Sequence, residues 1–214
     1  MSTFVLVPGA QATGRHWVHV VAALRDMGHE AVAPDLPAGP GADLDACAAA
    51  VAAAAEGRPD VVVAGHSLGC FTASLAAERI GARLLVLVCP MIPAPGESAA
   101  VWWDATGWEA ARHDAGLPPD PDDDRDFFHD VSAERVAEVR RDGEHPGPSG
   151  MWEDPWPLHA WPDVATRVLL CRDDRFLPPA FVRRVARERL GVTPDEMDGG
   201  HLPAMARPEE LAAR

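Results

Sequence analysis

The segment Val61–Cys70 (VVVAGHSLGC) contains the residue pattern in this chain that is best suited to nucleophilic chemistry. An apolar, β-branched run leads into Gly65-His66-Ser67-Leu68-Gly69, and a helix-forming run follows from Phe71 to Arg79. A buried strand that turns sharply into a helix holds its middle residue in a strained conformation and lifts that hydroxyl clear of the sheet. The pattern predicts Ser67 as a nucleophile and the Leu68 N–H as an oxyanion donor. A plain glycine-flanked turn with an exposed serine is the alternative.

A serine hydroxyl is a weak nucleophile until a base takes its proton, and that base needs a third group to orient it. The apolar run Val168–Cys171 leads into two adjacent carboxylates, Asp173 and Asp174. Further on, two glycines precede His201, and they allow the backbone to direct this imidazole towards the serine. We therefore expect His201 to be the general base and one of the two aspartates to orient it. The other histidines fit surface or packing positions better.

The elements that must position these residues alternate between strands and helices. Such alternation predicts an α/β fold with a mostly parallel sheet of about six strands and helices on both faces, in a single domain over residues 1–214. The strands are expected at Phe4–Val7, Glu30–Ala33, Val61–Ala64, Leu84–Val88, Arg167–Cys171 and Val192–Met197. Helices are expected at Trp17–Met27, Asp43–Glu56, Phe71–Arg79 and Pro179–Leu190, with a short one from Pro208.

Residues 90–162 interrupt this alternation and are rich in Trp, Pro and Asp. We interpret them as a helical lid, with helical pieces near Ala99–Ala115 and Ser132–Arg141, over the carboxyl ends of the strands, where such sheets bind ligands. Trp102, Trp103 and Trp152 are the candidates for contact with a substrate. The remaining tryptophans of the segment are expected to attach it to the core. The proline-crowded acidic run at 118–124 lacks the ligand spacing of a calcium loop and is expected to be a solvated loop.

Charge and cysteine content exclude several classes of protein. The 214 residues carry a formal net charge of −14 and contain no lysine, which argues against nucleic acids and anionic membranes as partners. The four cysteines lie in apolar runs without paired spacing, so we expect free thiols and no metal site. No signal peptide or membrane-spanning run is seen, so a cytoplasmic location is expected.

On these motifs the chain resembles the α/β-hydrolase superfamily, in particular plant methylester esterases and hydroxynitrile lyase-type hydrolases. The resemblance implies the order nucleophile, acid, histidine and places the acid at Asp174, between Cys171 and Pro178; Asp173 is the alternative. It also implies that the Ala10 N–H is the second oxyanion donor. The chain departs from these relatives at Pro8, where a histidine usually supports the loop.

The expected function is a serine esterase for a small, largely apolar acyl ester, with a small-molecule substrate and no cofactor. A lyase or cyclase using the same triad for acid–base chemistry is the first alternative, although Ala10 and Leu202 replace the threonine and lysine of hydroxynitrile lyases. A dehalogenase would need a carboxylate at Ser67. A non-catalytic ligand receptor is the third reading. The lid or an edge strand could support a homodimer.

Overall fold

The sheet contains six strands, and every neighbouring pair is parallel. The computed structural model describes residues 1–39, 41–142 and 147–214. The strand order is β2-β1-β3-β4-β5-β6, so the first strand lies beside the edge strand β2 and the last strand forms the opposite edge. The strands are β1 (Thr3–Val7), β2 (Glu30–Val32), β3 (Val61–His66), β4 (Leu84–Val88), β5 (Thr166–Cys171) and β6 (Asp195–Met197). The predicted parallel α/β fold is confirmed.

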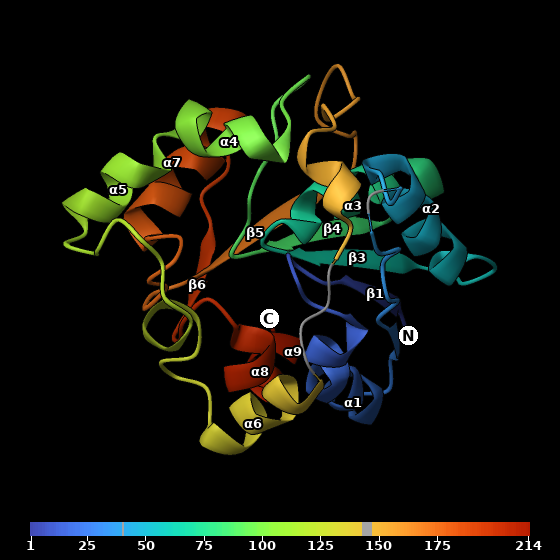
Figure 1. Cartoon of the computed structure of the whole chain (residues 1–214). Helices are drawn as coiled ribbons and strands as arrows, with labels where there is room; N and C mark the ends of the chain where they lie inside the picture. The colour runs from blue at the N-terminus through green and yellow to red at the C-terminus, as the bar shows by residue number, and fades with distance from the viewer. Residues whose placement is uncertain (40, 143–146) are drawn as a thin grey trace.

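Helices cover both faces of this sheet (Figure 1). Side chains alternate along a strand, so Val5 and Val7 of β1 pack into one apolar cluster while Leu6 packs into another. The first cluster is covered by α2 (Leu44–Ala55), α3 (Gly69–Ile80) and α7 (Pro179–Leu190), and the second by α1 (Val18–Asp26) and α9 (Pro208–Ala212). Near-continuous apolar strands are the consequence of this double burial.

The helix ends follow local capping chemistry. Asp43 precedes α2 and its carboxylate accepts from the Ala46 N–H at 2.7 Å, which satisfies one of the unpaired amides of the first turn. The first predicted helix is divided. Thr13 caps a 3-10 turn, η1 (Gly14–Trp17), and α1 starts only at Val18.

The segment between β4 and β5 contains helices and no strand among its described residues. They are α4 (Ala99–Thr106), α5 (Trp108–Asp114), the π-helical turn η2 (Asp123–Phe127), α6 (Ala133–Asp142) and the 3-10 turn η3 (Ser149–Trp152). Gly107, at φ +66°, ends α4 and turns the chain into α5, so the single helical stretch expected at 99–115 is two helices. Figure 1 shows α4 and α5 beside α7, and α6 beside α8 (Pro203–Ala206).

A buried arginine attaches this inserted segment to the core. Arg112 and Asp126 are both fully buried, and Nη2 of Arg112 lies 3.2 Å from the carboxylate. Arg112 also donates to the carbonyl oxygen of Arg175 at 2.6 Å. The insertion is therefore held against the loop that follows β5. Its movement as a lid stays a prediction.

The cysteines and the helix lengths bear on the expected free thiols and on the expected lack of a membrane-spanning run. All four cysteines are buried, and none forms a disulfide bond. Within the described ranges, no helix has the length and apolar character needed to cross a bilayer.

Candidate active site

Ser67 occupies the tight turn between β3 and α3. Its φ of +51° lies in the left-handed region, which is unfavourable for a residue with a side chain. The turn is held by a hydrogen bond from the Ser67 N–H to the Val88 carbonyl at 3.0 Å. A Cβ at position 69 would lie 2.2 Å from the carbonyl oxygen of Pro8, so glycine is required there for α3 to approach the loop after β1.

His201 lies between Ser67 and Asp174 in one hydrogen-bonded chain. Its Nε2 is 3.1 Å from Oγ of Ser67, and its Nδ1 is 2.8 Å from Oδ2 of Asp174. The three residues come from the ends of β3 and β5 and from the loop after β6, so they meet at the carboxyl edge of the sheet. Ser67 is 6 % exposed, Asp174 4 % and His201 1 %. The imidazole is thus placed to take the serine proton while the carboxylate holds its other nitrogen.

The two adjacent aspartates have different positions. Oδ1 of Asp174 accepts the backbone N–H groups of Phe176 and Leu177, both at 2.8 Å, which leaves Oδ2 for the imidazole. Asp173 instead pairs with Gly199: its N–H donates to the Gly199 carbonyl at 3.0 Å and its carboxylate accepts the Gly199 N–H at 3.2 Å. The structure therefore brings Asp174 to the histidine and uses Asp173 to hold the turn.

His66 supports the loop that carries His201. Its Nε2 lies 2.8 Å from the carbonyl oxygen of His201, and a carbonyl only accepts, so Nε2 carries the proton. Burial, with the neighbouring His201 as a smaller cause, lowers the pKa of His66 from 6.5 to about 3. His66 is therefore a neutral donor that fixes the backbone of the candidate base.

Aromatic rings enclose the imidazole of His201. The rings of Phe127 and Phe176 meet it edge-on at centroid distances of 5.4 Å and 4.9 Å. Phe176 lies in the loop after β5 that carries Asp174, here called the acid loop, and Phe127 lies in the segment inserted between β4 and β5. These contacts restrict rotation of the imidazole and limit the access of water to its pair with Asp174.

The two predicted oxyanion donors lie beside Ser67. Ala10 and Leu68 both line the cavity that contains the serine hydroxyl. Within residues 1–39, 41–142 and 147–214, neither backbone N–H has a hydrogen-bond acceptor, which is the condition for donating to a substrate oxygen. Pro8 does not prevent this arrangement: its carbonyl oxygen would lie 2.2 Å from a Cβ at Gly69, so the loop packs closely against the turn that carries Ser67, and Ala10 lines the cavity.

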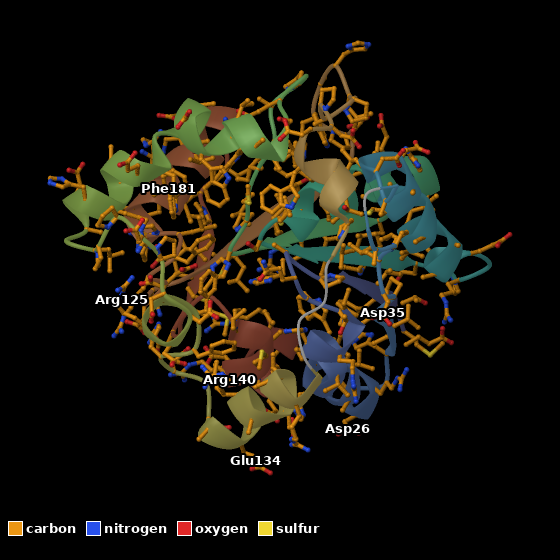
Figure 2. All side chains as sticks on the ribbon, viewed as in Figure 1. Asp26, Asp35, Arg125, Glu134, Arg140 and Phe181 are labelled. Atoms are coloured by element: carbon orange, nitrogen blue, oxygen red, sulfur yellow. The ribbon has the colours of Figure 1, made fainter. Side chains whose placement is uncertain are left out.

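A cavity of about 780 Å³ opens above Ser67, a volume within the range of small-molecule sites. The predicted contacts Trp103 and Trp152 both line it. Trp102 does not line it. It is fully buried, its indole N–H donates to the Ile92 carbonyl at 2.8 Å, and Phe181 of α7, labelled in Figure 2, packs edge-on against it. The structure therefore does not support a substrate contact for Trp102.

A thiol lies next to the candidate acid. The sulfur of Cys89, a carboxylate oxygen of Asp174 and a ring nitrogen of His201 lie within 4.8 Å of one another, and all three residues are buried. A hydrogen bond with Cys171 and burial raise the pKa of the Cys89 thiol well above its ordinary value. The thiol therefore stays protonated and adds no negative charge beside Asp174.

Two positioning groups lack a sequence signal. Asp130, far from His201 in sequence, accepts the Gly200 N–H at 2.7 Å. The partner of His66 is a backbone carbonyl, which no residue pattern marks. Phe176 could have been found, because it lies two residues after Asp174 in the acid loop.

Comparison with known proteins agrees with this fold. The family model described as the alpha/beta hydrolase family matches residues 4–214. The alpha/beta hydrolase nvfD of Aspergillus novofumigatus (strain IBT 16806) is 25 % identical over 228 residues, covering 96 % of this chain and 91 % of that protein. The chain belongs to the alpha/beta hydrolase family.

Solved structures show the same fold at low sequence identity. Polyneuridine aldehyde esterase superposes with a TM-score of 0.80 at 19 % identity, covering 100 % of this chain and 97 % of the other. The methylesterase MES16 from Arabidopsis superposes with a TM-score of 0.74 at 15 % identity, covering 100 % and 96 %.

Proposed function

We propose that this protein is a serine hydrolase that cleaves carboxylic esters with a small, largely apolar acyl group. The observation that carries the proposal is the chain of contacts from Ser67 through His201 to Asp174, at 3.1 Å and 2.8 Å. Beside it lie two backbone N–H groups that have no acceptor among the residues the structure describes. The names of the esterase and the methylesterase that share the fold agree with ester hydrolysis.

In the proposed mechanism, His201 Nε2 takes the proton of Ser67 as Oγ attacks the ester carbonyl. The carbonyl oxygen becomes negative and accepts hydrogen bonds from the N–H groups of Ala10 and Leu68. Asp174 stabilises the imidazolium, which then protonates the leaving alcohol. A water molecule, activated by the same imidazole, releases the acid from Ser67. None of these steps needs a metal or a cofactor.

The lining of the cavity supports an apolar acyl group. Trp103, Phe127, Trp152 and Phe176 contribute aromatic surface close to Ser67. Removing an alkyl chain from water against such surface is favourable by about 25 cal/mol per Å². Arg140 and Asp123 also line the cavity, and Arg140 is held by an ion pair with Asp124, so this polar part belongs to the insertion.

The test is hydrolysis of 4-nitrophenyl butyrate by the wild type, by Ser67→Ala and by Ser132→Ala. Ser132 is an exposed serine outside the cavity and serves as the matched control. We expect Ser67→Ala to lose essentially all activity while Ser132→Ala retains it. Full activity of Ser67→Ala would refute the proposal, and so would an inactive wild type against esters of every acyl length.

A further inference from the structure

The helix α5 of the insertion donates two hydrogen bonds to the acid loop. Figure 1 shows α5 beside α7, the helix that begins where this loop ends. Trp108 and Arg112 lie four residues apart on α5, so their side chains leave the same face of the helix. Nε1 of Trp108 donates to the carbonyl oxygen of Phe176 at 2.8 Å. Nη1 of Arg112 donates to the carbonyl oxygen of Arg175 at 2.6 Å. The helix thus holds two consecutive carbonyl groups directly after Asp174.

The candidate acid is bound to the same stretch of backbone. Oδ1 of Asp174 accepts the N–H groups of Phe176 and Leu177, each at 2.8 Å. Both polar backbone groups of Phe176 therefore have a fixed partner, its N–H on Asp174 and its carbonyl on Trp108. Oδ2 of the same carboxylate lies 2.8 Å from Nδ1 of His201. A displacement of the backbone at Phe176 would therefore also move the acceptor that orients the imidazole.

The ring of Phe176 makes a second contact between α5 and the imidazole. Its centroid lies 4.9 Å from that of His201 and 5.6 Å from that of Trp108, edge-on in both cases. Trp103 completes the group, at 4.8 Å from Trp108 and 5.7 Å from Phe176. Trp103 and Phe176 line the cavity above Ser67, whereas Trp108 lies outside it. Trp108 therefore acts on the reacting centre through Phe176.

The guanidinium of Arg112 is itself fixed. It is fully buried, and its Nη2 lies 3.2 Å from the equally buried carboxylate of Asp126. Its Nε and Nη2 donate to the carbonyl oxygen of Pro118 at 3.1 Å and 2.8 Å. Its central carbon lies 5.2 Å from the centroid of the Trp108 ring. Moving this group would leave a buried charge and several buried acceptors without partners, which is costly. Arg112 and Trp108 are therefore held in place before any substrate binds.

We propose that Trp108 and Arg112 are positioning residues for the candidate triad. From outside the cavity, α5 holds the acid loop in the conformation in which Asp174 and Phe176 contact the imidazole of His201. The proposal rests on the proposed ester hydrolysis and gives this part of the insertion a role in it. A lid movement that leaves the triad intact would have to keep α5 in place.

The experiment compares two matched tryptophan variants in the hydrolysis of 4-nitrophenyl butyrate. Trp108→Phe keeps an aromatic ring and removes the N–H that the Phe176 carbonyl accepts. Trp161→Phe is the control: Trp161 is half-buried like Trp108, its N–H donates to Oγ1 of Thr166 at 3.0 Å, and it lies outside the cavity. We expect Trp108→Phe to lower kcat about tenfold with KM within about twofold, because a small displacement of catalytic groups slows the reaction strongly. Trp161→Phe should keep the wild-type kcat.

Arg112→Lys tests the second donor. It keeps a positive charge for Asp126 but loses the planar fork that reaches several acceptors at once, so we expect kcat to fall about tenfold or more. Urea unfolding shows which variants are folded under the assay conditions. Wild-type kcat in folded Arg112→Lys would overturn the role of Arg112, and Trp108→Phe decides the proposal where Arg112→Lys does not fold. The proposal is overturned if Trp108→Phe keeps the kcat of Trp161→Phe, or if it raises KM at unchanged kcat.

Proton NMR distinguishes failure of this proposal from failure of the proposed function. The Nδ1–H of His201, hydrogen-bonded to Asp174, gives a downfield signal that needs no turnover and is assigned by its loss in His201→Ala. We expect Trp108→Phe to shift or broaden this signal and Trp161→Phe to leave it unchanged. An unchanged signal in Trp108→Phe overturns the positioning role and leaves the esterase intact. A wild type inactive against every ester refutes the esterase, while a signal altered only in Trp108→Phe still supports the positioning of His201 by α5.

Discussion

The backbone N–H of Gly200 donates to Oδ2 of Asp130 at 2.7 Å. Asp130 belongs to the inserted segment and Gly200 immediately precedes His201, so the insertion directly holds the loop of the candidate base. A Cβ at Gly200 would lie 2.7 Å from the other oxygen of Asp130 and 2.6 Å from Nε2 of His129. Only glycine allows this close approach. The loop that carries His201 is thus held at Gly200 by Asp130 of the insertion and at Gly199 by Asp173 of the acid loop.

Replacing Asp130 tests this relationship. Asp130→Ala removes the acceptor and leaves a buried N–H without a partner, which destabilises the loop by about 1–3 kcal/mol. We expect kcat to fall about 10- to 100-fold, because small displacements of a base reduce catalysis strongly, while KM changes little. Asp130→Asn keeps an oxygen for the Gly200 N–H and should recover most of the activity.

Asp104→Ala is the control for Asp130, since Asp104 is an exposed carboxylate of the same insertion. It should leave kcat unchanged. If Asp130→Ala lowered kcat no more than Asp104→Ala does, the contact would have no role in positioning His201.

Substitution of each of the two neighbouring aspartates should lower kcat to a different extent. Asp174→Asn removes the negative charge. Its amide oxygen is needed by the N–H groups of Phe176 and Leu177, so its NH2 group, a donor, faces Nδ1 of His201. We expect kcat to fall about 10³- to 10⁴-fold, as in other serine triads. Asp173→Asn keeps an oxygen for the Gly199 N–H and should reduce kcat less than tenfold. Steady-state hydrolysis of 4-nitrophenyl butyrate measures both. The reverse order of effects would assign the acid to Asp173.

His66 should make the fold sensitive to acid. Because burial lowers its pKa from 6.5 to about 3, the unfolded chain binds a proton at this histidine below pH 6.5 while the folded chain does not. The contribution of His66 to stability is thus complete above pH 6.5. It decreases by up to about 1.4 kcal/mol per pH unit as the pH falls towards 3.

The measurement is urea unfolding between pH 7.5 and pH 4.5. His66→Gln cannot titrate, so the free energy of unfolding should fall less steeply with decreasing pH than in the wild type. His113→Gln, at a side chain that is 90 % exposed, should keep the wild-type slope. Equal slopes for His66→Gln and the wild type would mean that folding does not lower the pKa of His66.

The tryptophans should divide into two functional groups. Trp152→Ala enlarges the cavity and should shift the preferred acyl length of nitrophenyl esters towards longer chains. Trp102→Phe removes the hydrogen bond to Ile92 and should lower stability by about 0.5–1.5 kcal/mol without changing that preference. An altered acyl preference in Trp102→Phe alone would contradict the placement of the two rings.

Most of the sheet could be predicted from the sequence, because each buried strand is a short apolar run bounded by turn residues. Leu84–Val88 and Pro179–Leu190 were predicted with the bounds that the structure has. The insertion was harder, since its helices are stabilised by distant contacts such as Arg112 with Arg175. The helix α8 was not predicted. It is one turn long and leaves too little periodicity to be recognised.

The residues of the candidate site also fall into two groups, those that a local sequence pattern marks and those that only tertiary packing places. Ser67 and Leu68 lie in one short motif, and His201 follows a glycine pair, so local pattern was sufficient to select them. Trp102 and Trp103 are adjacent in α4, and composition could not distinguish the ring that faces the core from the ring that faces the cavity. Only the tertiary packing, through Ile92 and Phe181, decides that.

The central claim is that Ser67 becomes covalently acylated because His201 takes its proton. Intact-protein and peptide mass spectrometry after treatment with a fluorophosphonate, or with 4-nitrophenyl butyrate quenched in acid, measures this directly. We predict one adduct, on the peptide that contains Ser67, which is absent in Ser67→Ala and strongly slowed in His201→Ala. An adduct on another residue, or labelling of Ser67 at the same rate without His201, would contradict the account.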